Sequence, residues 1–283
     1  MGAWGVCREA RSSLLYETYW GLREKPFENT PDPRFFYQSP ACAELWTRLL
    51  YVLKERRGAA LLTGGPGCGK TLMARALLRE LDSGRTEIAL VHQPCKTSEE
   101  FLREVLYQLG HEIEVPDRAN LVHRIQELLY EHHTAGKSTI LGVDEGQLLA
   151  EAPIFEEMRL LLNFQLNDAF LITMLLLGQA KLGEKLKAYA PLDQLLATRG
   201  ILHPLGQSEV DRYLSHRLRV AGRKESLFTP DAVELVYEHS GGIPRKINNI
   251  CDIALVIGYS RKVEEIDGEV MYNLIQTERG HGP

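Results

Sequence analysis

Apolar residues in the first part of the chain form short continuous runs, separated by stretches in which apolar residues recur at helical spacing. Runs of this length fit buried strands. Their alternation with amphipathic helices predicts βαβ units and a parallel sheet covered on both faces. Five runs predict strands: residues 59–63, 87–92, 139–144, 171–178 and 200–205. The pattern therefore predicts an α/β fold with a five-stranded parallel sheet.

The pattern changes after Pro204, where no further strand-like run occurs and only helical spacing continues. Ser208 and Asp211 resemble a capping box that opens a first helix, and Pro244 fits the first turn of a later one. A last helix is predicted at residues 267–276. We expect three parts: a poorly ordered leader at residues 1–15, an α/β core with its N-terminal linker at residues 16–206, and a helical domain at residues 207–283.

Composition narrows the class of protein. Of 283 residues, 44% are hydrophobic and 25% are charged, which suits a soluble core with a modest second domain. The formal net charge of −5 provides no global basic field to attract nucleic acid. The five cysteines form no CxxC pair, which indicates reduced thiols. No segment approaches the roughly 20 apolar residues that cross a bilayer, so we expect a cytoplasmic protein.

A glycine-rich octet follows the first predicted strand and precedes a helix predicted at residues 72–81. It matches the G-x-x-x-x-G-K-[ST] pattern of a P-loop, in the strand–loop–helix context that the pattern requires. Its glycines let backbone N–H groups converge on phosphate oxygens, and the helix N-terminus adds a favourable dipole. We expect Lys70 to bind the outer phosphates of ATP and the Thr71 hydroxyl to ligate Mg²⁺. The predicted nucleotide-binding residues are Gly64, Gly65, Pro66, Gly67, Cys68, Gly69, Lys70, Thr71 and Leu72.

Two acidic residues, Asp144 and Glu145, end the third predicted strand. An aspartate there can hold Mg²⁺, partly through water, and an adjacent glutamate can orient the attacking water and take its proton. The alternative is an ordinary pair of solvated acids at the end of a strand. Because the pair follows a P-loop, we expect Asp144 to bind the nucleotide with its metal and Glu145 to catalyse hydrolysis.

Three further polar residues could reach the phosphates. Gln179 follows the fourth predicted strand, at the sheet edge where nucleotide is expected, and could sense the γ-phosphate. Arg199 precedes the fifth predicted strand and Arg245 opens a helix of the helical domain, so either could act in its own subunit or in a neighbour. Taken alone, each arginine is more often a surface side chain, and Gln179 is also an ordinary first residue of a loop.

Besides the P-loop, six segments are typical of one family: residues 19–27 (YWGLREKPF), 31–37 (PDPRFFY), 144–148 (DEGQL), 159–164 (RLLLNF), 177–179 (LGQ) and 240–249 (SGGIPRKINN). On these segments the chain resembles the ATPase domain of the ExeA, or general secretion pathway protein A, family of AAA+ proteins. The resemblance covers residues 16–276. The P-loop is generic to the superfamily, whereas the second and last segments are more specific. The resemblance implies a P-loop AAA+ core followed by a small all-helical lid.

The resemblance also implies a role for each matching residue. The positions are Lys70 and Thr71 for Walker A, Asp144 and Glu145 for Walker B, Gln179 for sensor 1, Arg199 for an arginine finger and Arg245 for sensor 2. A finger supplied by a neighbouring subunit implies a homo-oligomer with ATP at the subunit interfaces. The sequence departs from the family at Thr198, which replaces a glutamine, and at Cys68, which replaces threonine or serine and suggests sensitivity to thiol reagents.

Two functions fit these features. The first is an ATPase of the secretion or pilus-assembly type, acting as an oligomeric motor or switch for a protein partner complex. The alternative is an ATP-dependent, DNA-binding regulator of transposition. The DNA phosphates would then be contacted by Arg56 and Arg57, or by Arg217, Arg219, Arg223 and Lys224. The acidic total charge favours the first function. A third possibility, a nucleotide-dependent scaffold, requires that Glu145 be dispensable.

Overall fold

The computed structural model describes residues 16–92, 95–111, 117–149, 151–166, 170–278 and 280. The described residues form two compact units, one within residues 31–203 and the other made of residues 16–30 together with those from Pro204 onward. The first unit contains the sheet, and the second contains helices only. The expected leader at residues 1–15 lies outside the described residues.

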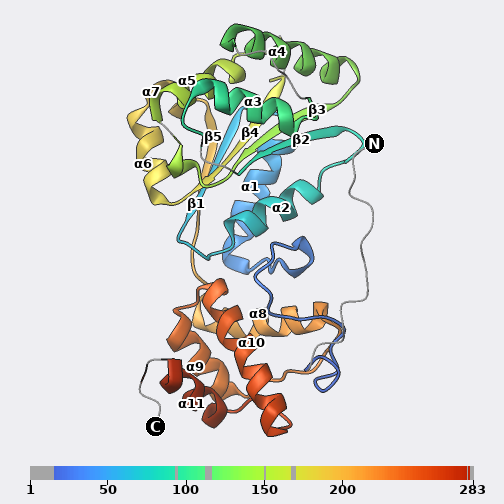
Figure 1. The fold of residues 1–283 in the computed structure, drawn as a ribbon, viewed down its shortest axis with the longest axis vertical. Coiled ribbons are helices and arrows are strands. Elements are labelled where there is room, and N and C mark those ends of the chain that lie inside the picture. The colour runs from blue at the N-terminus through green and yellow to red at the C-terminus, as the bar shows by residue number, and fades with distance from the viewer. Residues whose placement is uncertain are drawn as a thin grey trace. The chain divides into compact units, whose positions relative to one another are not determined.

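All five predicted strands occur, and they form one parallel sheet (Figure 1). Their bounds are β1 Ala59–Gly64, β2 Thr86–Val91, β3 Ser138–Val143, β4 Ile172–Gly178 and β5 Leu196–Leu202. The strand order is β2-β3-β4-β1-β5. Strand β1, which precedes the P-loop, therefore lies between β4 and β5. The carboxyl ends of β3 and β4 lie on the same edge of the sheet.

Strand β5 begins earlier than the apolar pattern predicts. Residues 200–205 were expected, whereas the strand is Leu196–Leu202. It lies at the edge of the sheet, and most of its residues are only partly buried. An edge strand needs no continuous apolar run, so its polar first half, with Thr198 and Arg199, gave no strand signal.

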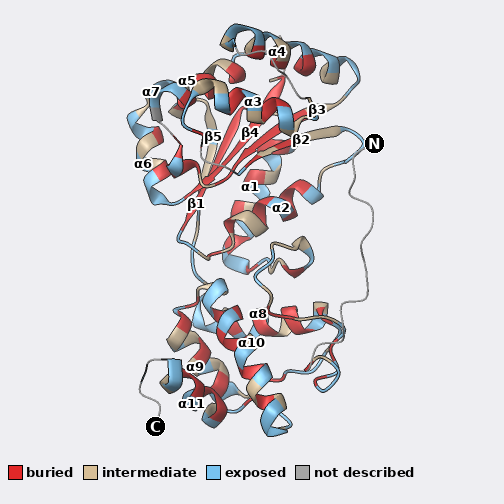
Figure 2. Ribbon diagram, in the orientation of Figure 1, coloured by how far each residue is buried: buried red, intermediate tan, exposed pale blue. Residues whose placement is uncertain are grey.

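Helices cover both faces of the sheet. Alternate residues of β1 point to opposite faces: Ala60 and Leu62 pack with the first helices, and Ala59 and Leu61 with the later ones. The central strands β1 and β4 are consequently buried along their whole length (Figure 2). The first face carries α1 Ala43–Lys54 and α2 Lys70–Arg79. The second face carries α3 Ser98–Gln108, α4 Arg118–Thr134, α5 Glu151–Leu162, α6 Ala180–Ala188 and α7 Ala190–Asp193.

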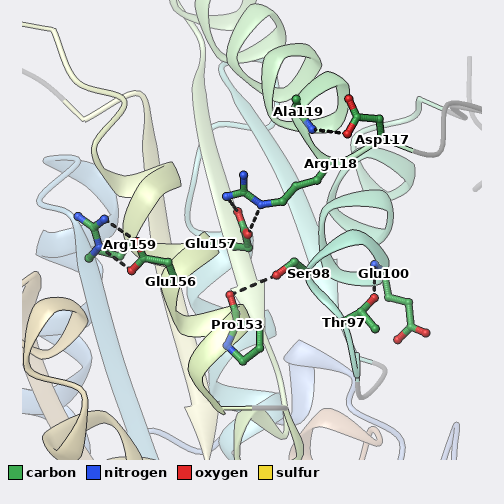
Figure 3. A network of polar contacts seen from close by, with 10 residues as sticks. All are labelled: Thr97, Ser98, Glu100, Asp117, Arg118, Ala119, Pro153, Glu156, Glu157 and Arg159. Atoms are coloured by element: carbon green, nitrogen blue, oxygen red, sulfur yellow. Dashed lines mark hydrogen bonds and ion pairs between the residues drawn. The ribbon is translucent and has the colours of Figure 1, made fainter.

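Polar contacts join three helices on the second face (Figure 3). The Arg118 guanidinium, at the start of α4, binds the Glu157 carboxylate of α5 through Nε at 2.6 Å and Nη2 at 2.9 Å. The Ser98 hydroxyl of α3 donates to the Pro153 carbonyl of α5 at 3.4 Å. Glu157 is only 3% exposed. Its buried negative charge is therefore offset by the bidentate contact with Arg118.

Replacing Arg118 by alanine is expected to lower the free energy of unfolding by about 3 kcal/mol, because it leaves a buried carboxylate without its partner. With a urea m-value of about 2 kcal/mol/M, the unfolding midpoint falls by about 1.5 M. Arg124→Ala is the matched control, since Arg124 binds the exposed Glu127 and Glu131, and should cost less than about 1 kcal/mol. Equal shifts of the unfolding midpoint in the two variants would contradict a special stabilising role for the buried Arg118–Glu157 pair.

The helical unit contains α8 Gln207–Val220, α9 Pro230–Ser240, α10 Pro244–Arg261 and α11 Gly268–Glu278. Pro244 opens α10 as expected. The capping box predicted at Ser208 and Asp211 is wrong, because the N-cap of α8 is Gly206, whose N–H donates to the Glu209 carboxylate at 2.9 Å. Of the helices that the structure describes, none is both long and apolar enough to span a membrane.

Residues 16–30 pack with this helical unit, not with the α/β core to which the linker was assigned. The Trp20 indole N–H donates to the Leu255 carbonyl of α10 at 2.9 Å. Trp20 and Phe27 are each 2% exposed. The sequence shows that these aromatic side chains need burial, but it does not show which unit buries them.

The same packing uses two of the arginines considered for DNA. Arg217 is 2% exposed and donates to the carbonyls of Pro26 and Glu28, the latter at 2.8 Å. Arg223 donates to the Trp20 carbonyl at 2.7 Å. Both guanidinium groups hold the segment of residues 16–30 in place. The side chain of Arg217 is therefore buried and is not available to contact DNA phosphates.

Candidate functional site

The predicted P-loop connects β1 to α2 in the expected strand–loop–helix order. Gly69 is the N-cap of α2 and has φ +100°, and Gly67 has φ +79°. Both lie in the left-handed region, which glycine adopts without the clash of a Cβ. Nothing lies within 4 Å of a Cβ built on Gly69. The constraint at this position is therefore the backbone conformation and not lack of space.

Lys70, the first residue of α2, is 5% exposed. Its Nζ donates to the carbonyls of Gly64 at 3.0 Å and Gly65 at 3.1 Å. The fold thus holds the ammonium group inside the loop, against its first two residues. A buried ammonium group needs partners that compensate its charge, and phosphate oxygens bound in the same loop would be stronger partners than neutral carbonyls.

The second residue of α2, Thr71, meets the end of β3. Its hydroxyl donates to Asp144 Oδ2 at 2.7 Å, although the two residues are far apart in the sequence. Asp144 is 9% exposed, and its Oδ1 accepts the Glu145 N–H at 2.8 Å. A hydroxyl and a carboxylate side by side are the hard oxygen ligands that suit Mg²⁺. These two residues therefore fit the predicted metal site.

Glu145 follows Asp144 in a left-handed conformation, with φ +49°. This is uncommon for a residue with a side chain. The carboxylate accepts a hydrogen bond from the Gln147 side-chain amide. The other end of that amide accepts the main-chain N–H of Gln179 at 3.0 Å. The structure thus brings Glu145 and Gln179 to one edge of the sheet, joined through Gln147.

Two residues of this region were not identified as site residues from the sequence. His92 follows β2, and its Nδ1 lies 3.8 Å from Asp144 Oδ2. A signal did exist, because the carboxyl ends of neighbouring parallel strands meet at one edge, and β2 pairs with β3. Gln147 stood in the family segment at residues 144–148, but its side-chain partners depend on the fold.

The two arginines are placed differently. The guanidinium of Arg199, in β5, binds the Asp193 carboxylate of α7 at 2.6 Å and its carbonyl at 3.3 Å. The guanidinium that was expected to act as an arginine finger is therefore bound to Asp193 in this structure. Arg245 is exposed in the first turn of α10 and belongs to the helical unit.

Cys68 is 5% exposed within the P-loop. Burial raises the pKa of its thiol above the usual value, and the nearby Lys70 offsets only part of this. The thiolate is the reactive form, so the raised pKa reduces the thiolate fraction at neutral pH. This environment opposes the sensitivity to thiol reagents that the sequence suggested.

Comparisons with known proteins agree with this geometry. The family model described as "AAA domain" matches residues 53–186, which include the P-loop, Asp144 and Glu145. General secretion pathway protein A of Aeromonas hydrophila is 36% identical over 256 residues. That match covers 89% of this chain and 46% of the relative, so the chain spans about half the length of the curated relative it matches.

Solved structures share the fold at low sequence identity. The ORC2 protein of Aeropyrum pernix, in ADPNP–ADP complexes, gives a TM-score of 0.68 at 15% identity, over 89% of this chain and 71% of that one. Cdc6p of Pyrobaculum aerophilum gives 0.70 at 16%, over 85% and 67%. Identities this low support the fold alone. The family model and the secretion relative, taken together, show that the chain contains an AAA domain with a P-loop and that it is a homologue of general secretion pathway protein A over 89% of its own length.

Proposed function

We propose that the protein binds ATP with Mg²⁺ on the P-loop and hydrolyses it, with Glu145 as the general base. The observation that carries the proposal is the hydrogen bond between Thr71 and Asp144, with Glu145 as the next residue. This contact supports the proposal because it joins side chains of two separate motifs, and Glu145 carries a second carboxylate one residue further along the chain. The AAA domain implies a P-loop ATPase, and the step from nucleotide binding to hydrolysis rests on Glu145.

Each of the predicted site residues has a defined task in this reaction. The P-loop N–H groups and Lys70 bind the phosphate oxygens and offset their charge as it develops. Thr71 and Asp144 would hold Mg²⁺, which would supply positive charge to offset that of the phosphates. Glu145 orients a water molecule for attack and accepts its proton. Gln179, at the end of β4, is the residue that we assign to sensing the γ-phosphate.

ATP turnover by the purified chain tests the proposal. Phosphate release is expected with Mg²⁺ and should stop when EDTA removes the metal. Duplex DNA is expected to leave the rate unchanged within about twofold, because Arg217 is buried and Arg223 is bound to a carbonyl. No phosphate release with Mg²⁺ and ATP would refute hydrolysis. Strong stimulation by DNA that falls steeply with salt would support the regulator of transposition instead.

The wider role follows from the relative whose name refers to general secretion. We propose an oligomeric motor or switch of the secretion or pilus-assembly type, with ATP at the interfaces between subunits. AAA folds are typical of oligomers. Arg199 is then the candidate finger, and it must leave Asp193 to reach a neighbouring subunit.

Mixing two inactive variants tests the shared site. Arg199→Ala is expected to lose turnover by about 10³-fold, the lower range for a finger, and Lys70→Ala to lose ATP binding. A mixed oligomer pairs a Lys70→Ala subunit, with an intact finger, beside an Arg199→Ala subunit, with an intact P-loop. Turnover should therefore recover in the mixture, measured at several ratios. Arg57→Ala, at an exposed arginine, is the control. Absence of recovery would argue against a finger supplied by a neighbour.

A further inference from the structure

Gln147 makes polar contacts with both Glu145 and Gln179, two of the predicted catalytic residues. It belongs to the short 3-10 helix Gly146–Leu148 and is 9% exposed. Its side-chain Nε2 donates to the Glu145 carboxylate, and its Oε1 accepts the Gln179 main-chain N–H at 3.0 Å. Its own carbonyl accepts from Lys185 Nζ at 2.9 Å. One side chain therefore joins the end of β3 to the end of β4.

The backbone around Gln147 is shaped to admit this side chain. A Cβ built on Gly178 would lie 2.8 Å from Gln147 Oε1 and 2.6 Å from Leu182 Cδ2. Real Cβ atoms essentially never approach so closely, so a larger residue at the end of β4 would displace the Gln147 or Leu182 side chain. The absence of a Cβ at Gly178 leaves room for the Gln147 amide to reach both Glu145 and Gln179.

The chemistry of the contact selects an amide. To join Glu145 to the Gln179 N–H, one end of the side chain must donate to a carboxylate and the other must accept from a backbone donor. Glutamine does both. An ionised glutamate at this position could only accept, and it would place a second negative charge beside Glu145. An apolar side chain of the same length would make neither contact.

We propose that Gln147 is a positioning residue for hydrolysis, which fixes the orientation of the Glu145 carboxylate and ties it to the backbone at Gln179. The inference rests on the proposed function, in which Glu145 acts as the base. Gln147 does not bind nucleotide in this proposal. Its loss should therefore affect the rate of hydrolysis and leave the binding of ATP intact.

The experiment compares steady-state turnover and ATP affinity in Gln147→Met, which keeps the length of the side chain and removes both hydrogen bonds. We expect kcat to fall about 10- to 100-fold, the scale for a misplaced catalytic group, and KM to change less than about threefold. Gln108→Met is the matched control, because Gln108 donates to the Glu104 carboxylate on α3, at 2.8 Å. It should keep wild-type turnover.

A double variant separates positioning from a general structural role. If Gln147 acts through Glu145, adding Gln147→Met to Glu145→Gln should lower kcat by less than about twofold more, since the group that it orients is already lost. Multiplicative effects, or a kcat for Gln147→Met within twofold of wild type, would overturn this inference alone. Wild-type turnover in Glu145→Gln would overturn the proposed base and this inference together.

Discussion

Replacing Glu145 by glutamine is expected to lower ATP turnover by about 10²- to 10³-fold, within the usual contribution of a general base. The amide keeps the size of the side chain but cannot take a proton from water. ATP affinity should stay within about threefold of the wild type, because the phosphates are bound by the P-loop and Lys70. Phosphate release and the binding of a fluorescent ATP analogue measure the two quantities separately.

The control for Glu145→Gln is the same chemical change at Glu234, an exposed residue of α9. Glu234→Gln should turn over ATP at the wild-type rate. Unimpaired turnover in Glu145→Gln would leave the protein without its assigned base. The nucleotide-dependent scaffold would then become the better description of its function.

Replacing Lys70 by alanine should weaken ATP binding by about 100-fold and abolish measurable turnover. A charged hydrogen-bond donor to phosphate contributes about 3 kcal/mol, which corresponds to about two decades in affinity. The fold holds Nζ within hydrogen-bond distance of Gly64 and Gly65, so the ammonium group is already inside the loop. Calorimetric titration with ATP and Mg²⁺ measures the loss directly.

Lys187→Ala is the matched control for this change, since Lys187 is exposed on α6. Removing its charge should leave ATP affinity unchanged within about twofold. The far-UV circular dichroism of both variants shows whether the fold is retained. Normal ATP affinity in Lys70→Ala, with the fold intact, would refute the assignment of the P-loop.

The sequence predicted the parts of the molecule that depend on local pattern. Buried strands of a parallel sheet are continuous apolar runs, so four of the five strands were placed within a few residues. Strand β5 was displaced because an edge strand tolerates polar residues such as Thr198. The P-loop was identifiable because its chemistry lies in one contiguous octet with a strand before it and a helix after it.

The remaining features depend on contacts between distant segments. Trp20 could be recognised as a side chain that needs burial, but not as a partner of Leu255 in α10. The contact of Gln147 with both Glu145 and Gln179 exists only because β3 and β4 are neighbours in the sheet. Arg199 matched a family position, but its ion pair with Asp193, six residues earlier in the chain, depends on the conformation between α7 and β5.

The helical unit is built from two separate segments of the chain, because residues 16–30 pack with it. This affects how the protein folds during synthesis. During synthesis Trp20 leaves the ribosome long before its partner α10, and Phe27 leaves it long before its ring partner Phe228. The α/β unit is contiguous and can complete its own core first. Until the last helices emerge, two large aromatic side chains stay uncovered. Because exposed apolar surface promotes aggregation, we expect the nascent chain to be prone to aggregation during this interval.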